Sequence, residues 1–209
     1  MARTYPRAFK AFCDIERNNG DFSEYAFHSG VIIGDINRFS ARYALAMDFN
    51  GINVNGSTAE TERGYEALMR CLLAWGVVES YINLYPNVRG GNHAFFTFSS
   101  SECNALCNEL VLLGSDVSRL YDFIITNKHT DQTHKQQLHA FLNGTSLSPT
   151  YLLSGIRHVF GHGVLTGNVS NINTSVLNDL SKKLRDVLFD KLELHFDSVV
   201  QLHPDFTTN

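Results

Sequence analysis

The sequence predicts an all-α protein, an up-and-down bundle of about six or seven helices that forms a single domain over residues 1–209. Two observations carry this prediction. Long segments place apolar residues three and four positions apart, which is the spacing of one face of a helix. No internal repeat, low-complexity tract or Pro/Ser-rich linker divides the chain. Because short connections between long helices favour antiparallel neighbours, we expect the helices to alternate in direction.

Two helices are predicted in the first fifty residues. The earlier one is indicated by apolar side chains near the start of the chain, Phe9, Phe12 and Cys13. The later one has a full stripe at three- and four-residue steps, made by Ile32, Ile36, Phe39, Tyr43 and Met47.

A long helix is predicted between Ser57 and Pro86. Ser57 stands three residues before Glu60, which is the spacing of a capping box, and apolar residues continue at helical steps until Pro86 stops them. The segment makes about seven turns if Gly76 does not break it.

A second long helix is predicted from the capping-box pair Ser99 and Glu102, and it continues to Ile124 if Gly114 does not break it. The aromatic run before it, within residues 87–99, does not fit the helical scheme. This run is either a brief extended segment or an aromatic-rich loop folded onto the bundle, and the sequence does not separate the two.

Three more helices complete the bundle. A short amphipathic piece ends at Asn143, where an Asn-Gly pair follows. Ser148 as N-cap and Pro149 in the first turn then open the next helix. A last long helix carries an apolar stripe from Leu177 to Val199.

The composition is that of an ordinary globular protein, with 44% hydrophobic and 18% charged residues. Without an apolar run of signal-peptide or membrane-spanning length, we expect a cytoplasmic protein with no membrane partner. The net charge of −4 argues against a broad basic surface, so we expect no DNA partner, although a local phosphate site is compatible with it. Cys103 and Cys107 lie one helical turn apart, and without a second pair of ligands we expect them to pack and not to bind zinc.

One short stretch carries the functional hypothesis, residues 157–163 with the sequence Arg-His-Val-Phe-Gly-His-Gly. His158 follows Arg157 directly, and four residues separate Arg157 from His162. A guanidinium can meet the charge of a phosphate with two hydrogen bonds. An imidazole can transfer protons near neutral pH. Together these are residue types that can cleave RNA.

This pattern, late in an all-helical chain and before a final long helix, resembles the motif of the HEPN superfamily. In that motif an Arg is followed after four to six residues by a His, often with Asn, Asp or His directly after the Arg. The resemblance implies a helical bundle, usually dimeric, that in many members cuts RNA without a metal and in others only binds RNA or a protein. It implies Arg157, His158 and His162 as catalytic residues, with no cofactor and no metal. It also implies RNA, a second copy of the chain and an antitoxin-type protein as partners.

In this interpretation Arg157 stabilises the phosphorane and His162 is the general acid or base. His158 would orient His162, contact phosphate or supply the second proton transfer. On a regular helix, Arg157 and His162 point about 140° apart because they are five positions apart. They can converge only if the helix ends near residues 161–163 or if a second subunit supplies one of them.

Other interpretations of the motif stay open. Arg157 can be a surface residue paired with an acidic neighbour, and His162 can occupy a helix C-terminus, where a cation is favoured. His158 and His162 have the spacing of a helical metal pair, but no adjacent glutamate and no third ligand accompany them. The alternative function is a non-catalytic helical dimer that binds a protein partner or RNA.

Two further groups of residues are interpreted as solvated surface. Three histidines at five-residue spacing do not share a helical face, His129, His134 and His139. Three cations form a small basic patch on the last helix, Lys182, Lys183 and Arg185. This patch could follow a phosphate backbone if it lies near Arg157.

Overall fold

The computed structural model describes residues 3–18, 20–86, 92–127, 131–145, 149–168 and 171–207. Within these ranges the chain forms eight α-helices and no strand, which confirms the all-α prediction and exceeds the expected number of helices. The helices are α1 (Phe9–Arg17), α2 (Ile33–Asp48), α3 (Ala59–Ile82), α4 (Ser100–Leu112), α5 (Ser115–Thr126), α6 (Gln132–Leu142), α7 (Thr150–Gly161) and α8 (Thr174–Gln201). Two short 3₁₀ turns lie at Phe22–Glu24 and Asn92–Ala94.

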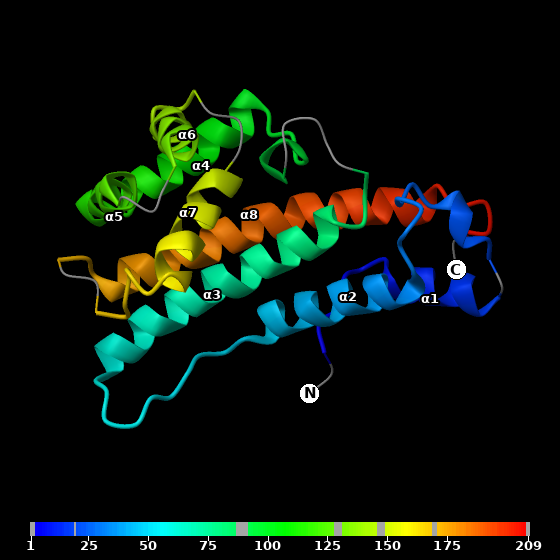
Figure 1. Ribbon diagram of the computed structural model, residues 1–209, viewed down its shortest axis with the longest axis horizontal. Coiled ribbons are helices and arrows are strands. Elements are labelled where there is room, and N and C mark those ends of the chain that lie inside the picture. Colours follow the sequence, from blue (N-terminus) through cyan, green and yellow to red (C-terminus); the bar gives the residue numbers. More distant parts are fainter. Residues whose placement is uncertain are drawn as a thin grey trace.

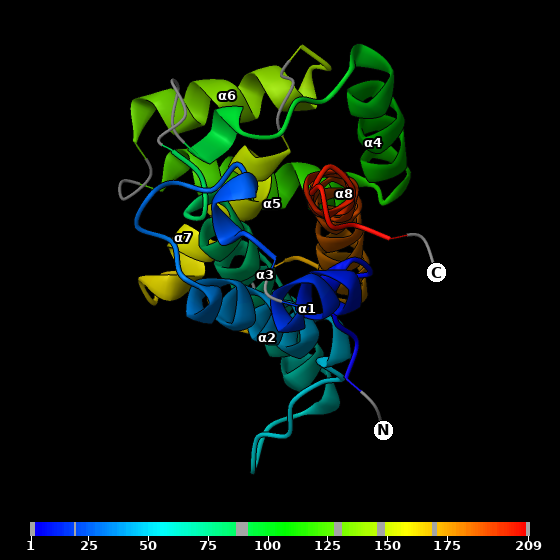
Figure 2. The ribbon, with the colours of Figure 1, turned by 90° about the vertical axis from the view of Figure 1, so that its right-hand side faces the viewer.

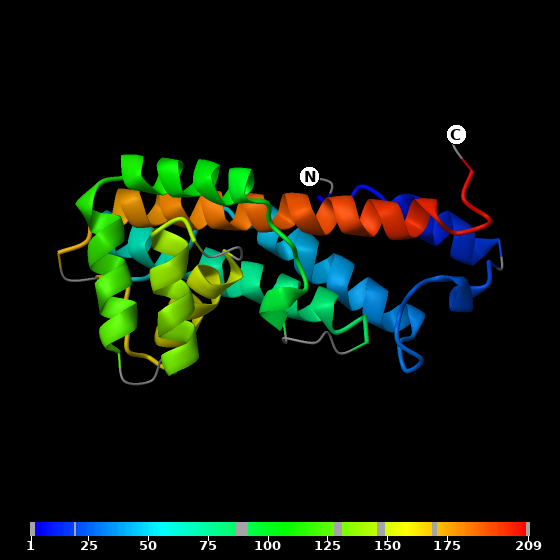
Figure 3. The same cartoon turned by 90° about the horizontal axis from the view of Figure 1, so that it is seen from above.

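The long helices α3 and α8 form the centre of the molecule and cross most of its length side by side (Figure 1). α2 packs against α3, and α1 lies beside the C-terminal end of α8 (Figure 1). On the other side, α4 runs alongside α8, while α5 and α6 run across the direction of α8 (Figure 3). α7 packs on α3 and also contacts α5, α6 and α8, so it connects this group to the central helices (Figure 2).

The two longest helices run parallel, which differs from the antiparallel neighbours expected. Arg63 near the start of α3 contacts Ser175 near the start of α8. Near the other end, the Tyr81 hydroxyl lies 2.6 Å from His195 Nδ1. Parallel neighbours need a connection that returns to the starting end, and α4 to α7 supply it. The apolar pattern did not reveal the parallel orientation, because it shows which face of each helix is buried and not the direction in which the helix runs.

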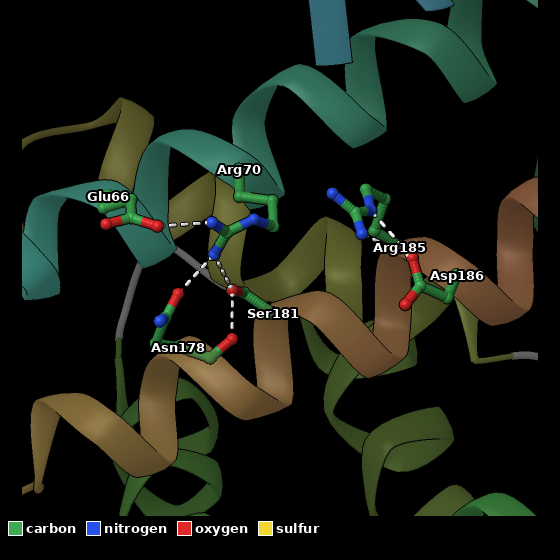
Figure 4. A network of polar contacts seen from close by, with 6 residues as sticks. All are labelled: Glu66, Arg70, Asn178, Ser181, Arg185 and Asp186. Atoms are coloured by element: carbon green, nitrogen blue, oxygen red, sulfur yellow. Dashed lines mark hydrogen bonds and ion pairs between the residues drawn. The ribbon is translucent and has the colours of Figure 1, made fainter. Parts of the chain in front are cut away.

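A buried arginine links α3 to α8 (Figure 4). Arg70 of α3 is only 3% exposed. Its guanidinium pairs with Glu66 at 2.5 Å and donates hydrogen bonds to Ser181 Oγ at 2.9 Å and to the Asn178 side chain. Glu66 lies one turn before Arg70 on α3 itself, whereas Asn178 and Ser181 belong to α8. Because an unsatisfied buried charge is costly, the two contacts with α8 favour the register of α3 and α8 in which both residues meet Arg70.

The start of α3 differs from the sequence prediction by one residue. Thr58 is the N-cap, and its Oγ1 accepts a hydrogen bond from the Thr61 N–H at 3.2 Å. The Ser57 hydroxyl instead donates to the Val54 carbonyl at 3.0 Å. The helix ends at Ile82, three residues before Tyr85, the last apolar residue of the predicted stripe.

The two glycines of the predicted long helices behave differently. α3 continues through Gly76, as the unbroken alternative requires. Gly114 adopts a φ of 86°, outside the helical region, and separates α4 from α5. The capping box of Ser99 and Glu102 at the start of α4 is confirmed, with both reciprocal hydrogen bonds formed.

The aromatic run before α4 is a loop folded onto the bundle over its described part, residues 92–99. It begins with a 3₁₀ turn, and Phe96 and Phe98 are buried in the core. The rest of the run lies outside the described residues, as does the predicted N-cap Ser148. Cys103 is buried and the Cys107 thiol donates to the Phe141 carbonyl at 3.1 Å, which agrees with the packing role expected for both.

Candidate active site at the end of α7

The motif of residues 157–163 lies at the C-terminal end of α7. The helix ends at Gly161, and His162 is its C-cap. Gly163 adopts a φ of 71°, and two backbone bonds close the end, from the Gly163 N–H to the Phe160 carbonyl and from the Val164 N–H to the Val159 carbonyl. This is a Schellman motif, which favours glycine at the left-handed position. Arg157 and His162 of one chain can converge only if the helix ends near residues 161–163, and α7 does end there.

Arg157 lies in the last full turn of α7 and points toward α3. Its guanidinium Nη2 lies 4.0 Å from Glu79 Oε2, and the two side chains are 39% and 36% exposed. An ion pair this long and this accessible contributes about 0–1 kcal/mol, because water competes for both charges. The structure thus pairs Arg157 with an acidic neighbour, yet leaves its guanidinium open to solvent.

The two histidines of the motif are brought together one turn apart. Their ring centroids are 4.4 Å apart, with an angle of 56° between the planes. His162 is exposed, whereas His158 is half-buried and its Nε2 is buried without a hydrogen-bond partner among the described residues. The His162 ring therefore faces solvent, and the Nε2 side of the His158 ring faces the protein interior.

His134 of α6 lies beside the inner side of α7. It is 9% exposed, so the interpretation of a solvated residue was wrong for His134, although His139 is exposed as expected and His129 lies outside the described residues. Its Nε2 donates to the Tyr151 carbonyl at 2.6 Å. Burial, with a smaller contribution from His158, lowers the pKa of His134. Helical spacing could not identify this burial, because it depends on α7 packing against α6.

Gly155 allows this close packing of α6 on α7. A Cβ at this position would lie 3.2 Å from His134 Nε2 and 3.1 Å from Ile124 Cγ2. Because Gly155 has no side chain, the His134 ring can reach the backbone of α7 at the Tyr151 carbonyl. The contact holds α7 against α5 and α6.

A stack of aromatic rings fixes the start of α7. The His93 ring stacks on Tyr151 with 3.8 Å between ring centroids, and it also stacks on Trp75 of α3 with 5.4 Å between centroids. His93 Nδ1 is 2.9 Å from Thr150 Oγ1. Burial, and then the proximity of His134, lower the pKa of His93 to about 4. Sequence reasoning missed His93 because its partners are far away along the chain.

The loop that follows His162 is held by the start of α3. A Cβ on Gly64 would lie only 1.8 Å from the Gly167 carbonyl oxygen, and a Cβ on Gly167 would lie 2.4 Å from the Tyr65 ring. The two backbones approach this closely because neither glycine has a side chain. Arg119 of α5 also donates to the Asn171 carbonyl at 2.9 Å, so α5 contacts the loop as well.

The basic patch on α8 is not an open cationic surface. Lys183 pairs with Glu109 of α4 at 2.7 Å, and Arg185 pairs with Asp186 at 2.7 Å. The Arg185 side chain is only 16% exposed. Two of the three cations thus already have carboxylate partners, and the low exposure of Arg185 corrects the interpretation of this residue as solvated surface.

Comparison of the chain with protein-family models, curated proteins and solved structures finds no match. Among the described residues, no group of three or more His, Cys, Asp or Glu side chains is placed to hold a metal ion. None of the helices in the described ranges combines the length and the apolar character needed to span a bilayer. The end of α7 is therefore the candidate site of this chain.

Proposed function

We propose that this chain is a HEPN-like protein that cleaves RNA without a metal. One observation carries the proposal: α7 ends at the motif, with the exposed C-cap His162 beside His158 and with a solvent-accessible Arg157 directly before His158 in the last turn. The end of a helix that is packed on several others is a rigid support for such groups. Toxin, defence and RNA-processing roles all fit this chemistry.

The proposed reaction is an internal transfer of the phosphodiester. The 2′-hydroxyl loses its proton and forms a bond to the neighbouring phosphorus, while the bond to the 5′-oxygen breaks and that oxygen gains a proton. The products are a 2′,3′-cyclic phosphate and a 5′-hydroxyl. Arg157 would neutralise the charge that develops on the nonbridging oxygens. His162 would transfer one proton, and His158 would orient it, contact phosphate or transfer the other.

The ion pair between Arg157 and Glu79 is compatible with this role. An exposed pair at 4.0 Å is weak, whereas a phosphate can accept two charge-assisted hydrogen bonds from one guanidinium. A bound phosphodiester would therefore displace Glu79. Glu79 would act as a resting partner that holds Arg157 near the end of α7.

We propose a homodimer as the active assembly. Two copies related by a twofold axis would place two motifs across one cleft, and Arg157 of one protomer could then work with His162 of the other. The exposure of both side chains leaves them accessible to a second copy.

The test is cleavage of a labelled RNA in the presence of a chelator. We expect the parent protein to cut, Arg157→Ala to be about 10²–10³-fold slower and His162→Ala about 10²–10⁴-fold slower. Arg17→Ala and His139→Ala are matched controls, because both side chains are exposed and lie on other helices. If the parent does not cut, or if all variants cut equally, the nuclease proposal is wrong.

The second candidate is a non-catalytic helical dimer that binds RNA or an antitoxin-type protein. The ion pair between Arg157 and Glu79 favours it, because a paired guanidinium needs no catalytic role to explain its position. RNA binding without turnover that persists in the Arg157→Ala, His162→Ala double variant would support this candidate over the first.

A further inference from the structure

A polar pocket of about 250 Å³ lies between the start of α2 and the end of α3. α2 contributes Arg38 and Arg42, α3 and its C-cap contribute Ser80 and Asn83, and the preceding loop contributes His28. The His28 N–H donates to the carbonyl of Leu84 at 3.0 Å, which holds this loop against the end of α3. The pocket walls are therefore tied together by the backbone.

The pocket carries more positive than negative charge, although the whole chain is acidic. Arg38 and Arg42 lie one helical turn apart and are both exposed. Asp35 is the carboxylate in the lining, and it pairs with Arg38 while it also caps α2 by accepting from the Ile32 N–H at 3.0 Å. Arg42 has no carboxylate partner among the described residues. Its guanidinium is thus the group that an anion can engage without breaking an ion pair.

The remaining polar groups of the pocket include further donors, although the Ser80 hydroxyl already donates to the Val77 carbonyl at 2.8 Å. His28 Nδ1 accepts a hydrogen bond from the Gly30 N–H at 3.0 Å. A neutral imidazole whose Nδ1 accepts carries its proton on Nε2, so Nε2 can donate to a ligand. The Asn83 side chain supplies two more N–H groups. Donors at several points around two guanidinium groups suit a phosphate, which has more acceptor oxygens than a carboxylate.

We propose that this pocket binds a phosphate group, with Arg42 and Arg38 as its principal ligands and His28 and Asn83 as further donors. The phosphate can belong to a small phosphorylated ligand such as a nucleotide or to the backbone of RNA. The proposal does not depend on RNA cleavage at α7, because none of its residues belongs to the motif. The two proposed sites would both border the end of α3, where Glu79 pairs with Arg157 of the motif and Ser80 lines the pocket.

The experiment is calorimetric titration of the full chain with inorganic phosphate, a nucleoside monophosphate and a short RNA that has a 5′-hydroxyl. The RNA is 2′-O-methylated throughout so that cleavage cannot occur. We expect binding that weakens about tenfold or more in Arg42→Ala, because one charge-assisted contact is lost. Arg17→Ala, an exposed arginine on α1, should bind like the parent. Urea unfolding of each variant would show that the fold is intact.

The comparison of ligands identifies the source of the phosphate. Tighter binding of the mononucleotide than of RNA, lost in Arg42→Ala, assigns the pocket to a free phosphorylated ligand. Tighter binding of RNA, lost in the same variant, assigns it to the RNA backbone. Equal affinity of Arg42→Ala and the parent for all three probes, or no binding of any probe, would overturn the proposal.

Discussion

Replacement of Gly64 by alanine tests whether the loop after the motif is held against α3. Gly64 lies in the first turns of α3, and a Cβ there would lie 1.8 Å from the carbonyl oxygen of Gly167. Carbon and oxygen atoms in contact are normally more than about 3 Å apart. The loop or the helix must therefore move by more than an ångström to accept a single methyl group.

The expected cost can be worked out from two opposing contributions. Alanine stabilises a helix interior by about 1 kcal/mol relative to glycine. Overpacking of a tight contact costs on the order of 3 kcal/mol, and here the neighbouring atom belongs to the backbone, which cannot rotate away as a side chain can. We therefore predict that Gly64→Ala lowers the free energy of unfolding by about 2 kcal/mol.

The same helix offers a matched control. A Cβ on Gly76 meets no described atom within 4 Å, so Gly76→Ala should raise the free energy of unfolding by about 0.5–1 kcal/mol. Urea unfolding followed by circular dichroism measures both variants against the parent. If Gly64→Ala is as stable as Gly76→Ala, the close approach of α3 to the loop after the motif is refuted.

Three further predictions concern charge and assembly. Glu79→Gln should strengthen RNA binding several-fold, measured by fluorescence anisotropy, because Arg157 loses its resting partner, and an unchanged or lower affinity would contradict this role of Glu79. Because burial lowers the pKa of His93 to about 4, the unfolded state binds more protons between about pH 6.5 and 4, and stability falls as pH falls through this window. After allowance for partial exposure, His93 contributes about 1 kcal/mol of the loss between pH 7 and 5, and His93→Phe should show a correspondingly smaller drop in the urea midpoint. Finally, a mixture of Arg157→Ala and His162→Ala should regain about a quarter of the parent activity if the site forms across a dimer, whereas sites within one protomer would leave the mixture inactive.

The positions of the helices could be predicted from the sequence, but their directions could not. The stripe beginning at Ile32 and the capping box at Ser99 correspond to α2 and α4. Gly76 and Gly114 look alike in the sequence, yet only Gly114 takes a positive φ, because α3 is held straight by its packing on α8 and α2. Whether a glycine breaks a helix thus depends on tertiary contacts as well as on propensity.

The candidate site was predictable in part. The Gly at position 163 and the spacing of the motif pointed to a helix end, and α7 does end there. The partner of Arg157, Glu79, comes from α3, and His134, which bonds the backbone of α7, comes from α6. No local pattern indicates such contacts, because they arise only when α3 and α6 pack against α7.

The side chains at the end of α7 are proposed to cleave RNA by attack of the 2′-hydroxyl on the neighbouring phosphorus. The most direct measurement is incubation of the parent protein, in chelator, with an RNA and with its fully 2′-O-methylated counterpart, followed by mass analysis of the fragment ends. The proposed reaction predicts fragments with 2′,3′-cyclic phosphate ends from the RNA, an intact methylated strand, and no fragments from either strand with the Arg157→Ala, His162→Ala double variant. Cleavage of the methylated strand, or cleavage of the RNA that persists in the double variant, would contradict it.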